Sequence, residues 1–236
     1  MPRAARWRPW ASLAAAGLLA AGCATGASSL RSDAPPANLA DAKRHVSEYV
    51  ETGRYERDLA AVADQARRYL DSRVGGGGKL AIVVDVDETA LSNLPGLRAN
   101  DYGFIVGGPC ELPRGPCGLG AWIGMARAEA IKPVLALARH ARERGVAVFF
   151  LTGRPERMRA ATEQNLRAAG YEWTGVLLKP DALTTKSAVE FKAPERRKLV
   201  EEGYTIIVNI GDQMSDLDGG FAERTFKLPN PFYFIP

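Results

Sequence analysis

The chain has 236 residues, of which 46% are hydrophobic and 25% charged, and its formal net charge is +4. This length suffices for one substantial core, and length alone favours one domain. Arg3, Arg6 and Arg8 lie in a predicted leader segment. Without them the chain has 28 basic and 27 acidic residues and is nearly neutral. Nucleic-acid-binding proteins are expected to carry a basic stripe. The sequence shows none, so nucleic acid is excluded as a partner.

Residues 1–22 have the features of a secretory signal peptide. Three arginines precede an apolar run from Ala11 to Ala21, and the segment contains no acidic residue. The apolar run is too short for a membrane-spanning helix. We therefore predict that the protein is exported.

The end of this leader, Leu19-Ala-Ala-Gly-Cys23, resembles a bacterial lipobox. The resemblance implies lipidation of Cys23 and a membrane anchor. Ala24 resembles a sorting signal for the outer membrane, so the expected location is the cell envelope, with the domain facing the periplasm or the surface. Ordinary cleavage, with Cys23 incidental, remains an alternative. Residues 23–38 are small, polar and proline-containing, which predicts a flexible tether.

The remaining residues, 39–236, are predicted to form one domain. Apolar residues at helical spacing predict helices over 39–52 and 55–74, separated by Gly53. We expect these helices to pack against one face of a sheet.

A buried strand is predicted at Leu80-Ala-Ile-Val-Val, and it stops at Asp85 and Asp87. Side chains alternate along a strand, so both carboxylates are expected on the same side of its carboxyl end. Adjacent carboxylates repel unless a cation lies between them, and hard cations prefer oxygen ligands. This predicts a magnesium site. The alternative is ordinary turn chemistry, in which Asp side chains bond nearby backbone.

Residues 94–121 are rich in glycine and proline and predict a cap or specificity loop after the first strand. The segment contains Cys110 and Cys117. In an exported protein these cysteines favour a disulfide over a metal site. Two free thiols remain the alternative.

From Trp122 onward, helices and strands alternate. The pattern predicts helices over 131–144, 156–169 and 187–202, and strands over 146–151, 176–178 and 205–210. Pro194 is tolerated in the first turn of a helix, which favours a start near Lys192 for the last of these helices. The alternation predicts a three-layer, Rossmann-like α/β fold with a parallel sheet and helices on both faces.

In such a sheet the strand ends share one edge, where open α/β sheets bind ligands. The polar residues that follow three of the predicted strands are Asp85 and Asp87, Thr152 and Arg154, and Asp212 and Asp216. Each has an ordinary interpretation: a turn hydroxyl for Thr152, helix-capping carboxylates for Asp212 and Asp216, and a solvated helix charge for Lys192. Their joint placement at one edge favours a functional site.

Together these segments resemble the haloacid-dehalogenase-like (HAD) phosphatases. The matching positions are Asp85-Val-Asp87-Glu-Thr89, Thr152, Lys192 and Asp212-x-x-x-Asp216. Leu151-Thr-Gly-Arg, Gly211-Asp-Gln-Met-Ser-Asp216 and Phe226-Lys-Leu-Pro-Asn-Pro are similar to the subfamily IIIB acid phosphatases. That group includes plant vegetative storage proteins and bacterial class C lipoprotein acid phosphatases. Lys179 and Lys186 compete with Lys192 for the lysine position, and Lys192 is chosen because it lies twenty residues before Asp212.

The resemblance implies a Mg²⁺-dependent acid phosphatase acting on small phosphomonoesters, with nucleotides among the candidates. It assigns Asp85 as the nucleophile and Asp87 as the acid and base. It assigns phosphate binding to Thr152, Gly153 and Lys192. It assigns metal binding to Asp85, Asp87, Asp212 and Asp216. The alternatives are a storage or binding lipoprotein with an inactive site, and a phosphotransferase. The oligomeric state stays open, with a homodimer as one option.

Overall fold

The computed structural model describes residues 37–183 and 187–235. The predicted signal peptide and Cys23 lie outside the described residues, as does nearly all of the predicted tether. Within the described part of the chain, no helix is both long and apolar enough to cross a membrane.

The elements follow the predicted alternation, with short additions between them. The helices are α1 (Leu39–Glu51), α2 (Arg54–Arg73), α3 (Leu94–Ala99), α4 (Leu119–Met125), α5 (Lys132–Glu143), α6 (Arg159–Ala168), α7 (Ala188–Glu201) and α8 (Met214–Leu217). The strands are β1 (Lys79–Val84), β2 (Leu91–Ser92), β3 (Glu129–Ala130), β4 (Ala147–Pro155), β5 (Gly175–Lys179), β6 (Tyr204–Gly211) and β7 (Arg224–Lys227). Single 3₁₀ turns, Glu156–Met158 and Asp181–Leu183, follow β4 and β5.

Five strands form one sheet in the order β5-β4-β1-β6-β7, and every neighbouring pair is parallel. β2 and β3 pair separately as a short antiparallel ribbon beyond the end of β1. The predicted three-layer α/β fold is therefore confirmed. The edge strand β7 was not predicted, because its four residues, Arg-Thr-Phe-Lys, contain only one buried side chain.

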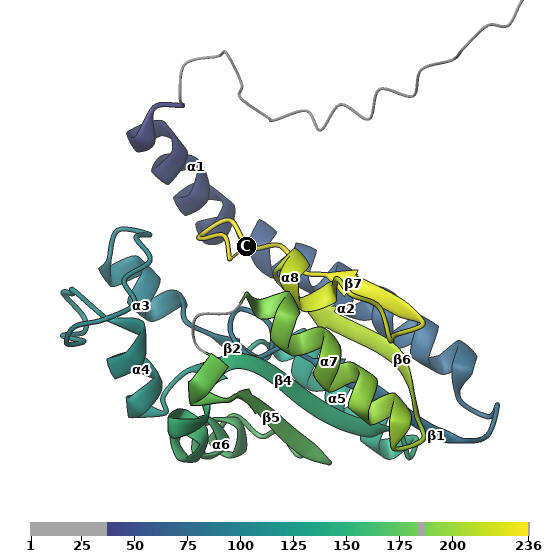
Figure 1. Cartoon of the computed structure of the whole chain (residues 1–236). Helices are drawn as coiled ribbons and strands as arrows, with labels where there is room; N and C mark the ends of the chain where they lie inside the picture. The colour runs from purple at the N-terminus through teal and green to yellow at the C-terminus, as the bar shows by residue number, and fades with distance from the viewer. Residues whose placement is uncertain (1–36, 184–186, 236) are drawn as a thin grey trace, which may run out of the picture. The chain divides into compact units, whose positions relative to one another are not determined.

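Helices cover both faces of the sheet (Figure 1). On one face, Ile82 and Val84 of β1 pack in a cluster with residues of α2 and α5. On the other face, Ala81 and Val83 pack with Phe191 of α7. This alternation is what a strand covered on both faces requires. The near-continuous apolar run of β1 therefore follows from its central position.

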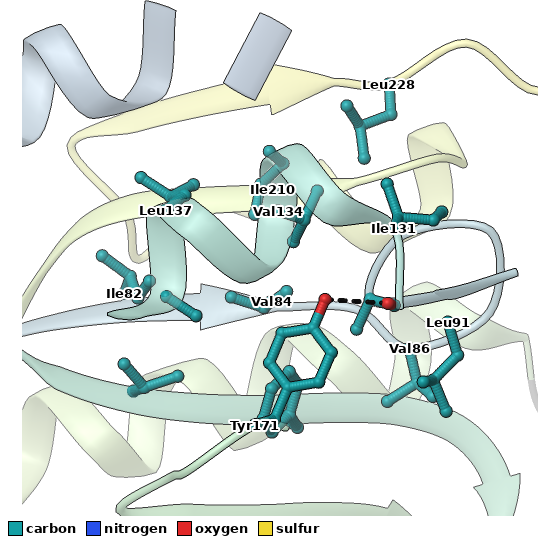
Figure 2. Close-up of a cluster of buried hydrophobic side chains, with 14 of the residues drawn as sticks. Ile82, Val84, Val86, Leu91, Ile131, Val134, Leu137, Tyr171, Ile210 and Leu228 are labelled. Carbon is teal, nitrogen blue, oxygen red and sulfur yellow. Dashed lines mark hydrogen bonds between the residues drawn. The ribbon is translucent and has the colours of Figure 1, made fainter. Parts of the chain in front are cut away.

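The larger cluster extends past the end of β1 and anchors the loop that follows (Figure 2). Val86 and Leu91 are fully buried in it. The Tyr171 hydroxyl donates a 2.8 Å hydrogen bond to the carbonyl of Ala90, and that carbonyl also accepts the backbone N–H of Ile131. Burying one such aliphatic side chain contributes about 1.5 to 3 kcal/mol. The loop that carries Asp87 is thus held by the core.

The expected start of α7 near Lys192 is wrong. The helix begins at Ala188, because Ser187 and Glu190 form a capping box: Glu190 N–H donates to Ser187 Oγ, and Ser187 N–H donates to the Glu190 carboxylate. Pro194 lies inside the helix, where it cannot donate to the carbonyl of Glu190. The cap compensates for this loss and places Lys192 within the helix, facing the end of β1.

The predicted cap segment contains α3 and the first residues of α4, and a Cys110–Cys117 disulfide links the chain between them. The Asn100 side chain binds Cys117 through both of its polar atoms: Asn100 Oδ1 accepts the Cys117 N–H at 2.7 Å, and Asn100 Nδ2 donates to the Cys117 carbonyl at 2.8 Å. Asn100 therefore joins the end of α3 to the residues just before α4, while the disulfide closes the loop between the two helices.

Replacing both cysteines by serine should lower the free energy of unfolding by about 2 to 3 kcal/mol, because the link closes a short loop in the unfolded chain. Urea denaturation of the parent, with and without reductant, and of the double variant measures this. Mass spectrometry after alkylation reports the bond directly. Two alkylated thiols in the unreduced parent, or stability unaffected by reductant, would contradict the prediction.

Candidate active site

A pocket of about 360 Å³ opens at the carboxyl edge of the sheet. Asp85 and Asp87 reach it from the end of β1, Gly153 from β4 and Asp212 from the end of β6. Val86, between the two aspartates, packs in the hydrophobic cluster instead. The predicted placement of both carboxylates on one side of the strand end is therefore seen in the structure.

Lys192 enters this pocket from α7 and joins two of its carboxylates. Its Nζ is 2.5 Å from Asp85 Oδ1 and 2.6 Å from Asp216 Oδ1, and all three side chains are at most 8% exposed. Burial lowers the pKa of a lysine, but the charges of Asp216 and Asp85 outweigh burial and raise the pKa of Lys192. The ammonium therefore remains charged. Of the competing lysines, Lys179 ends β5 outside the pocket lining, and Lys186 lies outside the described residues.

Three buried carboxylates, Asp85, Asp212 and Asp216, each place an oxygen within 4.8 Å of the others. Burial, and then the charge of Asp216, raise the pKa of Asp85 well above its usual range, although Lys192 offsets part of the rise. The same two causes raise the pKa of Asp212 to about 7. This crowding is what a cation between the carboxylates would relieve, and an all-oxygen donor set fits a hard divalent cation. The group can therefore hold a metal ion.

Asp212 receives hydrogen bonds on both carboxylate oxygens. Oδ1 accepts from the Thr89 hydroxyl at 3.2 Å, while Oδ2 accepts from Gln213 Nε2 and Asn230 Nδ2, both at 2.6 Å. Thr89 belongs to the predicted motif. Asn230 comes from the segment after β7 and was not predicted as a site residue. Its position could not be read from the sequence, because it depends on how the last residues return to the sheet.

Asp87 lies in a different electrostatic environment from Asp85. The guanidinium of Arg154 donates to both of its oxygens, with Nη2 2.7 Å from Oδ1 and Nε 3.0 Å from Oδ2. Asn93 Nδ2 donates a further bond to Oδ1 at 2.9 Å. Burial raises the pKa of Asp87, but Arg154 and then Asn93 outweigh it and hold the pKa below its usual range. In this arrangement Asp87 is an ionised carboxylate.

Thr152 and Gly153 lie near the end of β4, beside Arg154. Gly153 lines the pocket. Thr152 is fully buried, and its Oγ1 accepts the backbone N–H of Arg154 at 3.1 Å. A threonine hydroxyl that accepts one bond keeps its proton for donation. These residues therefore offer donors at the strand end.

Glu88 is a buried carboxyl that the sequence analysis did not assign to the site. Its φ of +50° turns the chain sharply after Asp87. The carboxyl accepts from Asn93 N at 2.7 Å and from the Tyr233 hydroxyl. Burial, and then the charge of Asp87, raise the pKa of Glu88 to about 7. The local signal, an unusual density of polar residues over 87–93, could have indicated this network but not its partners.

The fold and the arrangement of aspartates around one lysine define the haloacid-dehalogenase-like class of α/β enzymes. A family model for the HAD superfamily, subfamily IIIB (acid phosphatase), matches residues 16–236. The chain belongs to this acid phosphatase family.

Relatives from plants agree with this assignment. Acid phosphatase 1 of Solanum lycopersicum is 38% identical over 194 residues, which cover 81% of this chain and 73% of that protein. The stem 28 kDa glycoprotein of Glycine max is 36% identical, with 80% and 72% covered. Vegetative storage protein 2 of Arabidopsis thaliana is 31% identical, with 86% and 74% covered.

Among solved structures, the class C acid phosphatase from Bacillus anthracis is similar in fold. The TM-score is 0.65 and the sequence identity 23%, with 82% of this chain and 86% of that chain covered.

Gly211→Ala should disable the site without unfolding the domain. A Cβ at Gly211 would lie 2.5 Å from the Cβ of Asp216, so Asp216, which binds Lys192, must shift from its position. We expect a large fall in phosphomonoester hydrolysis with a retained cooperative melt. Gly124→Ala is the matched control, because a Cβ there meets nothing within 4 Å. Equal activity of the two variants would show that the position of Asp216 is not needed.

Proposed function

We propose that the protein is a magnesium-dependent phosphomonoesterase that works through an aspartyl-phosphate intermediate. The observation that carries the proposal is the buried group of Asp85, Asp212 and Asp216 around the Lys192 ammonium, open to one pocket. Phosphoryl transfer needs an in-line nucleophile and positive charge around the transferring group. The site offers a carboxylate nucleophile, an ammonium and a set of oxygen ligands that suits a divalent cation.

Asp85 is the proposed nucleophile. One carboxylate oxygen attacks phosphorus, the bond to the leaving oxygen breaks, and the phosphoryl group is left on Asp85, which divides one difficult step into two. Lys192 holds Oδ1 of Asp85 and supplies positive charge near the phosphate. Thr152 and the backbone N–H of Gly153 bind phosphate oxygens.

The proposed Mg²⁺ ligands are the side chains of Asp85 and Asp212 and the backbone carbonyl of Asp87, with Asp216 supporting the ion through water. When bound, Mg²⁺ polarises the phosphoryl group and shields the Asp85 carboxylate from its charge.

Asp87 is the proposed general acid and base. Arg154 keeps it ionised in the structure, and a phosphate placed beside it raises its pKa, because a like charge disfavours the carboxylate. Asp87 then carries the proton to the leaving oxygen. Once deprotonated, it takes a proton from the water that attacks phosphorus in the second step.

The proposed substrates are small phosphomonoesters with apolar or aromatic leaving groups, nucleotides among them. Two aromatic side chains that line the pocket with the aspartates support this: the rings of Phe104 and Tyr233, whose centroids are 4.3 Å apart. Tyr102 packs on Phe232 and Trp122 is buried against Asn93, so these two aromatic residues serve packing.

The cell-envelope location and the lipid anchor at Cys23 remain part of this proposal, as does a homodimer as one option for the oligomeric state. Two alternative functions would give different results in an activity assay. A storage-type protein would bind phosphate compounds without turnover, and a phosphotransferase would transfer the group to added alcohols. The buried Asp85 argues against the first, because a protein without turnover has no need of a nucleophile. Metal-dependent hydrolysis of an aryl phosphate, with a chelator control, is the deciding assay.

Asp85→Asn keeps the shape of the side chain and an oxygen for Lys192, but an amide is not a nucleophile. Turnover should fall to background while the melting curve stays cooperative. Asp101→Asn, the same change on an exposed carboxylate, should behave as the parent does. Turnover of Asp85→Asn close to that of the parent would remove Asp85 from the nucleophilic role.

Asp87→Asn should affect the two chemical steps differently. Loss of the acid should slow phosphorylation of Asp85 by about 100- to 10,000-fold for alkyl phosphates and much less for activated aryl phosphates, whose phenolates leave without a proton. Loss of the base should slow the second step for both substrates. Rapid-quench kinetics on an aryl substrate should therefore show a burst of phenol. Equal slowing of the first step for both substrates would exclude proton transfer by Asp87.

A further inference from the structure

We propose that the C-terminal strap, defined as residues 228–235, fixes the metal ligand Asp212 through two oriented side-chain amides, with Asn230 as the main positioning residue. The inference rests on the proposed function, since it takes Asp212 to be a metal ligand. It adds two residues, Asn230 and Gln213, that determine the orientation of the Asp212 carboxylate.

The orientation of the Asn230 amide is set by the strap itself. Its Oδ1 accepts the backbone N–H of Phe232 at 2.8 Å and that of Tyr233 at 3.3 Å. Backbone N–H groups can only donate, so this end of the amide is the oxygen. The Nδ2 group must then face Asp212 Oδ2, 2.6 Å away. The contact is therefore a donor to a carboxylate oxygen, with its direction fixed by the strap backbone.

The second amide is oriented in the same way. Gln213 Oε1 accepts the backbone N–H of Ile235 at 3.1 Å, which leaves Nε2 to donate to Asp212 Oδ2 at 2.6 Å. Both amides therefore converge on one oxygen of Asp212. The other oxygen, Oδ1, has only the longer bond from Thr89 among the hydrogen bonds of the described residues. Oδ1 thus keeps a lone pair for a cation, while the two hydrogen bonds to Oδ2 prevent rotation of the carboxylate.

The strap is itself well anchored. The Leu228 N–H donates to the Gly211 carbonyl at 2.9 Å, and the Leu228 side chain is fully buried (Figure 2). The Phe232 ring packs between Tyr55 and Tyr102, with centroids 5.4 Å and 6.0 Å away. Ser215 Oγ donates to the Ile235 carbonyl at 3.1 Å. Because the strap is attached along its length, it can hold the amides in place.

The test measures Mg²⁺ affinity by titration calorimetry on the full chain, without substrate. Asn230→Ser keeps a short side-chain acceptor for the turn but cannot reach Asp212. Removing a group that orients a metal ligand typically costs 10- to 100-fold in affinity, so we expect the Kd for Mg²⁺ to rise by about that factor. Gln213→Met, which removes the other amide at similar length, should also raise the Kd.

Phe232→Leu is the control for the strap in general. It reduces the aromatic packing of the strap on Tyr55 and Tyr102 but keeps the backbone N–H of residue 232 that binds Asn230. Its Kd for Mg²⁺ should stay close to that of the parent. Thermal melts of all variants, recorded without metal, check that the strap remains folded.

If the parent binds Mg²⁺ and both Asn230→Ser and Gln213→Met bind it with the affinity of the parent, this inference is wrong. The proposed function would still stand. An equal loss in Phe232→Leu would also overturn the inference, because the effect would then belong to the strap in general. A parent that neither binds Mg²⁺ nor hydrolyses a phosphomonoester would overturn the proposed function itself.

Discussion

The buried ammonium of Lys192, between Asp85 and Asp216, is the interaction on which the rest of the site depends. It joins three parts of the chain: the end of β1, the second turn of α7 and the short helix after β6. A lysine buried this deeply is tolerated only with partners, and the two carboxylates are tolerated partly because of the lysine. Breaking such a buried group by removing one partner typically costs 3 to 5 kcal/mol. Both carboxylates that bind the ammonium also line the open pocket, so the charges that support the fold are the ones available for chemistry.

Asp85 and Asp87 have opposite electrostatic surroundings, although only one residue separates them. Asp85 lies among other carboxylates, where burial raises its pKa, whereas Asp87 is bound through both oxygens by Arg154. Environments that separate the pKa values of paired carboxyls are typical of sites in which the two groups have different roles. Alternation along β1 brings both side chains to the pocket. Arg154 of β4 then acts on Asp87, while Asp216 of α8 and Lys192 of α7 act on Asp85.

The sequence predicted the parallel α/β sheet and the positions of Asp85, Asp87, Thr152 and Asp212, because each follows a recognisable strand and parallel strands end at one edge. The predicted start of α7 near Lys192 is wrong, because the capping box of Ser187 and Glu190 begins the helix earlier although Pro194 then lies inside it. Asn230 and the partners of Glu88 could not be predicted. The contacts of Asn230 depend on how the last residues return to the sheet, and those of Glu88 depend on a positive φ. Neither feature produces a periodic pattern in the sequence.

The carboxylates of the site come from opposite ends of the domain sequence, since Asp85 follows the first strand of the sheet and Asp212 the fourth of its five strands in chain order. In the unfolded chain they are far apart and cannot bind one ion together. A divalent cation would therefore bind the folded state almost exclusively, and mass action would stabilise the domain by about 2.7 kcal/mol at one hundred times the dissociation constant. The supply of the ion would then change the free energy of unfolding of the domain, and not only the rate at which it works.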